Sequence, residues 1–66
     1  MNIVNLDLKN ALILFKQQNY IKAKLALLEI IKNSNVDPKI YLILYEICNK
    51  LNEFNEAKKY LIKFLE

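Results

Sequence analysis

The chain has 66 residues, of which ten are lysines and seven are acidic, so its formal net charge is +3. A chain of this length makes one domain, here 1–66, and buries only about 60% of its unfolded surface, so its stability depends on added support. Because the chain has one cysteine and no histidine, it cannot form an intrachain disulfide or a zinc site. It has no glycine, which excludes a glycine-rich loop that binds phosphate. We therefore expect no cofactor, no metal and no catalytic residue.

The first half of the chain predicts two helices. With no glycine and a single proline the chain forms few turns, so its elements are few and long. Apolar residues at three- and four-residue steps predict a helix over about 6–17 and a second over about 20–32. The break at Gln17, Gln18 and Asn19 separates them, and asparagine is the best replacement for glycine in a left-handed helix end.

The second half predicts two more helices after a polar loop at 33–38. Asp37 is suited to accept hydrogen bonds from free amides at a helix start, and Pro38 fits the first helical position. The third helix therefore runs from Pro38 to about 51, with Ile40, Leu44, Ile47, Cys48 and Leu51 buried. A break around Asn52 precedes a fourth helix over about 54–65. The fold class is all-α.

The two halves resemble each other at a spacing of 34 residues. The pairs that share chemical character are Tyr20 and Phe54, Ala23 and Ala57, Leu27 and Leu61, Leu8 and Leu42, Ile13 and Ile47, and Lys16 and Lys50. When residues of the same chemical type recur at a fixed spacing, the chain contains one supersecondary unit used twice. We place the first unit at about 4–37 and the second at about 38–66.

This unit resembles the tetratricopeptide repeat, a 34-residue helix–turn–helix whose second helix opens with an aromatic residue and an alanine three positions later. Here those residues are Tyr20 with Ala23 and Phe54 with Ala57. The small alanine lets the two helices approach and the aromatic ring fills the bend. The resemblance implies two stacked antiparallel helix hairpins, as in an α-solenoid. Tyr45 departs from the family pattern, which has a small residue at that position of the first helix.

The resemblance also implies where a partner binds. In that family the first helix of each repeat lines a groove that holds an extended peptide or a helix. Aligning the repeats places nine residues on that face: Leu8, Leu12, Phe15 and Lys16 from the first unit, and Lys39, Leu42, Glu46, Asn49 and Lys50 from the second.

The ends of the repeat array indicate a second kind of surface. About three repeats are normally needed to bury a continuous core, and this chain has two. We therefore expect partly uncovered apolar residues at the end of the chain, namely Tyr60, Ile62, Phe64 and Leu65, and at its start, namely Ile3, Val4 and Leu6. Such a surface favours a homo-oligomer or packing against further repeats of a longer parent.

The predicted function is a non-enzymatic protein–protein interaction module that binds a peptide, a helix or itself. The alternative is a small basic helical regulatory protein that associates with nucleic acid through its lysines. The absence of arginine argues against base readout, which relies on arginine forks. No basic leader or bilayer-length apolar run is visible, so we expect a cytoplasmic protein without a membrane partner.

Overall fold

The computed structural model describes the backbone of residues 3–33 and 37–66, and the side chains of 7–32 and 37–66. The described residues form four helices, α1 (Ile3–Lys16), α2 (Tyr20–Asn33), α3 (Pro38–Lys50) and α4 (Phe54–Leu65). The all-α prediction is confirmed, and each predicted helix start from α2 onward coincides with the observed one. α1 begins three residues before its predicted start. The predicted loop lies mostly outside the described residues, at positions 34–36.

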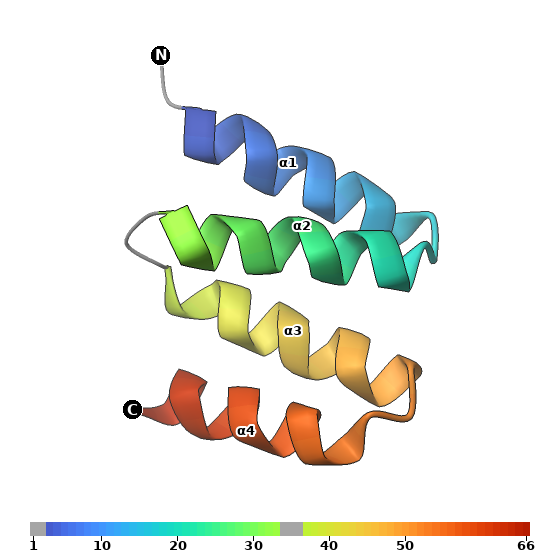
Figure 1. The fold of residues 1–66 in the computed structure, drawn as a ribbon, viewed down its shortest axis with the longest axis vertical. Helices are drawn as coiled ribbons and strands as arrows, with labels where there is room; N and C mark the ends of the chain where they lie inside the picture. The colour runs from blue at the N-terminus through green and yellow to red at the C-terminus, as the bar shows by residue number, and fades with distance from the viewer. Residues whose placement is uncertain (1–2, 34–36) are drawn as a thin grey trace. The chain divides into compact units, whose positions relative to one another are not determined.

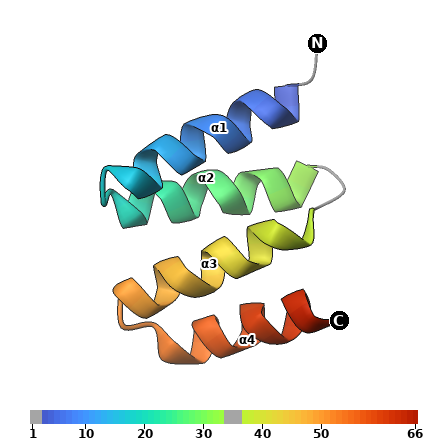
Figure 2. The ribbon, with the colours of Figure 1, turned by 180° about the vertical axis from the view of Figure 1, so that it is seen from behind.

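The chain divides into two compact units, Met1–Val36 and Asp37–Glu66. In the first unit α1 and α2 lie side by side and run in opposite directions, and in the second unit α3 and α4 do the same (Figures 1 and 2). Each unit is therefore an antiparallel helix hairpin. The boundary between the units falls one residue before the expected repeat boundary. That the two units act as one domain stays a prediction.

The turn inside each hairpin is closed by the same backbone hydrogen bonds. In the first turn the amide of Gln18 donates to the carbonyl of Phe15 at 3.0 Å, and the amide of Asn19 donates to Leu14 at 2.9 Å. These two bonds form a Schellman motif, in which carbonyls left free at a helix end accept from the next two amides. The residue after the helix adopts a left-handed conformation, and here that residue is Gln18, with φ of 62°, not Asn19.

The second turn repeats this arrangement 34 residues later. Asn52 has φ of 62°, its amide donates to Asn49 at 3.1 Å, and the amide of Glu53 donates to Cys48 at 2.8 Å. The next helix then begins with the same bond in both units, Ala23 to the carbonyl of residue 19 and Ala57 to that of residue 53. The repeat inferred from side-chain character is thus present in the backbone.

The start of α3 follows the local signals in its sequence. Asp37 is the N-cap, and its Oδ1 accepts a hydrogen bond from the amide of Lys39 at 3.0 Å. Pro38 occupies the first turn, where its missing donor costs no intrahelical bond. The predicted cap is confirmed.

The hairpins bury the small and branched residues that face their partner helix. Ala23 and Ala57, at matching positions, are both buried, as expected for residues that let two helices approach closely. Ile40, Leu44, Ile47 and Cys48 are buried along α3 as predicted, whereas Leu51 is half-buried. A buried alanine or leucine contributes through close packing, so these positions tolerate little change in volume.

Candidate functional site

The predicted partner-binding residues lie on one side of the first helix of each unit. On α1, Leu8, Leu12 and Phe15 are half-buried and Lys16 is exposed. Their spacing of four, three and one residues places them on a single face of the helix. We call these four residues the α1 stripe. It is mainly apolar and carries one cation at its C-terminal end.

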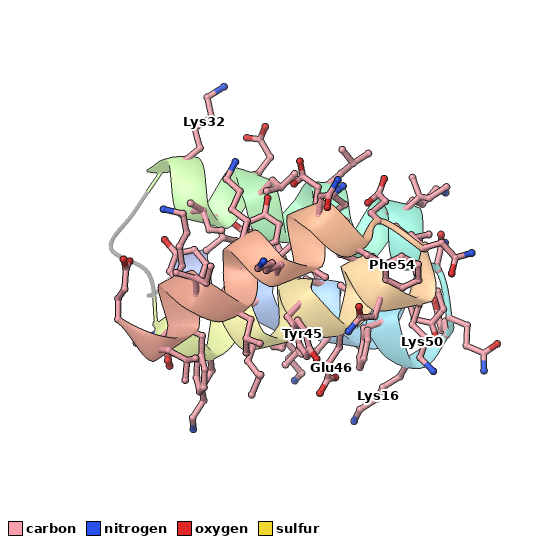
Figure 3. The ribbon with its side chains drawn as sticks, turned by 90° about the horizontal axis from the view of Figure 1, so that it is seen from below. Lys16, Lys32, Tyr45, Glu46, Lys50 and Phe54 are labelled. Atoms are coloured by element: carbon pink, nitrogen blue, oxygen red, sulfur yellow. The ribbon has the colours of Figure 1, made fainter. Side chains whose placement is uncertain are left out.

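The matching face of α3 has different chemistry. Leu42 and Asn49 are half-buried, and Lys39, Glu46 and Lys50 are exposed. We call these five residues the α3 stripe. Glu46 and Lys50 lie along the same side of the helix (Figure 3). None of the nine residues of the two stripes is buried, so all keep surface available to a partner.

Phe15 has a second role at the turn of the first unit. Its ring meets the ring of Tyr20 edge-on, with centroids 5.8 Å apart and planes inclined at 63°. Such edge-to-face pairs are favourable because the positive edge of one ring meets the negative face of the other. Tyr20 therefore packs at the bend as the resemblance implied.

Phe54 does not repeat this packing in the second unit. Its side chain is exposed, so the expectation that it fills the bend is wrong. The residue that matches Phe15 is Asn49, which offers no ring to pack against. Figure 3 shows Phe54 at the start of α4. Its exposed ring is surface available for contact with another molecule.

Tyr45 replaces the small residue of the repeat pattern without entering the helix pair. It is half-buried and lies on the same side of α3 as Glu46 and Lys50 (Figure 3). The matching residue of the first unit, Ala11, is buried. A large ring is accommodated at this position because it stays at the surface, next to the α3 stripe.

Of the four residues predicted for self-association, Tyr60 is not at the surface. It is only 8% exposed, and its ring stacks on that of Tyr41, with centroids 6.4 Å apart and planes at 18°. The Nζ of Lys63 lies over the Tyr41 ring of this stack, 5.9 Å from its centroid. The expectation that Tyr60 is partly uncovered is therefore wrong, because the ring of Tyr41 on α3 covers it.

The other three residues of that group do reach solvent. Leu65 is 72% exposed, Ile62 is 50% exposed and Phe64 is half-buried. The side chains of Ile3, Val4 and Leu6, expected to be uncovered at the start, lie outside the described residues. The end of α4 therefore presents an apolar surface without the tyrosine.

Two exposed apolar residues on α2 were missed by the sequence analysis. Ile21 is 64% exposed and Leu25 is 59% exposed, and they lie one helical turn apart. The signal for them was present in the repeat: the residues 34 positions later are Asn55 and Lys59. A polar residue in one copy and an apolar residue in the other marks a position that the fold itself does not require to be apolar.

The chain's one cysteine lies in the second unit. Cys48, which forms no disulfide, is buried in α3. Within residues 7–32 and 37–66, no three histidine, cysteine or acidic side chains gather where they could hold a metal ion. In the same part of the chain no helix has the length and apolar character needed to cross a membrane.

No protein-family model, curated protein or solved structure matches this chain.

Proposed function

We propose that this chain is a tetratricopeptide-like helical-repeat protein whose α1 and α3 stripes bind a peptide or a helix of another protein. The observation that carries the proposal is the duplicated hairpin, with the same turn geometry 34 residues apart and the same partly exposed face on each first helix. A repeated face with no buried member supports binding more than it supports catalysis.

The two stripes suit different parts of a partner. Leu8, Leu12 and Phe15 of the α1 stripe offer apolar surface to an apolar side chain. Asn49 and Lys50 of the α3 stripe offer an amide and a cation, which suit a peptide backbone and a carboxylate. The α1 stripe therefore suits an apolar segment of a partner, and the α3 stripe suits an acidic one.

Selection from a displayed library of random peptides tests this proposal, followed by calorimetry with the enriched peptides. Leu12→Gln should weaken about tenfold the peptides that bind the α1 stripe, and Asn49→Ala those that bind the α3 stripe, as expected for a contact near the centre of an interface. Lys59→Ala, on the exposed face of α4, is the matched control and should bind normally. Circular dichroism confirms that each variant stays helical.

Three results would count against the proposal. Enriched peptides that bind Leu12→Gln and Asn49→Ala as tightly as the unchanged chain would place the site elsewhere. A library that yields no binder, together with salt-dependent binding of oligonucleotides, would favour a nucleic-acid function. Sedimentation that finds only dimers, without any peptide binding, would favour self-association through Ile62 and Leu65.

A further inference from the structure

The outward face of α2 carries a row of apolar side chains. Ile21, Leu25 and Leu28 recur at steps of four and three residues, so they share one side of the helix. The first two are largely exposed and the third is half-buried. In α4 the residues matching Ile21 and Leu25 are Asn55 and Lys59, which are exposed and polar. The residue that matches Leu28 is Ile62, which is apolar and exposed, so the two copies differ at the first two positions of the row.

Two exposed lysines and one exposed acid, Glu29, border this row. Lys22 and Lys32 are exposed, and Lys32 projects outward from the last turn of α2 (Figure 3). The whole of Met1–Val36 has five lysines and two acidic residues, a formal net charge of +3. Asp37–Glu66 has five of each, a net charge of zero. The positive charge of the protein therefore belongs to the unit that carries the apolar face.

We propose that Ile21, Leu25 and Leu28, bordered by Lys22 and Lys32, form a docking surface for an acidic amphipathic helix of another protein. A straight apolar row at steps of four and three residues matches the apolar seam of a second helix. Glutamates beside that seam would face the lysines and select the partner by charge. This surface shares no residue with the α1 and α3 stripes, so its partner is additional to a peptide bound there.

The charge on this face disfavours a second copy of the chain as the occupant. The exposed lysines on this face outnumber its one acid, Glu29, so two copies joined through α2 would both present a net positive charge, and like charges repel. An anionic membrane surface is the remaining competitor, because basic amphipathic helices also bind lipid. Only three apolar side chains are offered here, which suits a narrow helix seam better than insertion among lipid headgroups.

Fluorescence anisotropy with a labelled synthetic peptide tests the proposal on the full chain. The probe is a helix with leucines at steps of three and four residues and glutamates beside them. A second peptide has lysines in place of the glutamates. Vesicles of phosphatidylcholine, with and without phosphatidylserine, are the lipid probes. We expect the acidic peptide to bind, and the basic peptide to bind at least about tenfold more weakly.

The chain supplies its own matched substitutions. Ile21→Asn and Leu25→Lys introduce the residues found at the same positions of the second unit, and each should weaken the acidic peptide about tenfold while circular dichroism stays unchanged. Ile13→Asn, an exposed apolar position on α1 outside the α1 stripe, should have no effect. Lys32→Glu should weaken binding severalfold at low ionic strength and much less at high salt, where charges are screened.

Several outcomes would overturn the proposal. One is equal binding of the acidic and basic peptides, and another is normal binding by Ile21→Asn. If the acidic peptide does not bind, whether or not phosphatidylserine vesicles do, an acidic helix is excluded as the partner of this surface. Equal losses of peptide binding in Ile13→Asn and Ile21→Asn would mean that exposed apolar residues act without regard to position.

Discussion

The left-handed conformation of Gln18 gives the sharpest test of this structure. An L-residue with a β-carbon pays about 1–2 kcal/mol in that conformation, and glycine pays almost nothing. Glycine also makes the unfolded chain more flexible, which costs about 0.5–1 kcal/mol. The difference predicts that Gln18→Gly stabilises the protein by about 0.5–1 kcal/mol. For a chain of this size that corresponds to a Tm about 2–8 °C higher.

The neighbouring glutamine is the matched control. Gln17 precedes Gln18 and is not among the described residues with positive φ. Gln17→Gly therefore gains nothing from relief of strain and should destabilise the protein by about 0.5–1 kcal/mol. Asn52→Gly should change stability less than Gln18→Gly does, because asparagine tolerates the left-handed region better than glutamine.

Urea and thermal denaturation followed by far-UV circular dichroism measure all three variants. The reasoning is refuted if Gln18→Gly and Gln17→Gly lower the Tm alike, because the two glutamines would then share one backbone conformation. An unchanged Tm for both would also count against it. A rise for Gln18→Gly alone is the expected result.

Substitutions at four further positions test the packing and the helix cap. Asp37→Ala removes the acceptor for the Lys39 amide and should cost about 1 kcal/mol, with faster hydrogen exchange at that amide, whereas Asp37→Asn should keep most of the stability. Leu44→Ala leaves a cavity in the second unit and should cost about 2–5 kcal/mol, whereas Leu44→Met should cost less than about 1.5 kcal/mol; equal Tm values for the two would contradict the burial of this residue. Ala23→Leu and Ala57→Leu should each cost about 1–3 kcal/mol through overpacking, and a neutral result at either would mean that the two helices of that hairpin are not in close contact there.

Local signals made most of the fold predictable. The starts of α2, α3 and α4 were predicted because apolar periodicity, the Asp37 cap and Pro38 act over a few neighbouring residues. The residue that turns left-handed was harder to place in the first break. Asn19 has the stronger intrinsic preference, but the hydrogen-bond register of the turn assigns that conformation to Gln18.

The candidate site was less predictable, because exposure depends on residues that are distant in the sequence. Tyr60 has the spacing of an end-facing residue, yet the ring of Tyr41 from the other helix of the hairpin covers it. Phe54 matches Tyr20 in sequence, but it lacks a ring at position 49 to pack against. In each case the partner across the hairpin, rather than the residue itself, determined the burial.

The hairpin turns have a consequence for how such a protein can evolve. The described bonds that close each turn join main-chain atoms, which every residue except proline supplies. Almost any substitution in the bend leaves those bonds in place, and only the left-handed position limits the choice of residue. Two copies of the unit can therefore diverge until few identities remain while their bends stay superimposable, which frees the outer faces to acquire different partners.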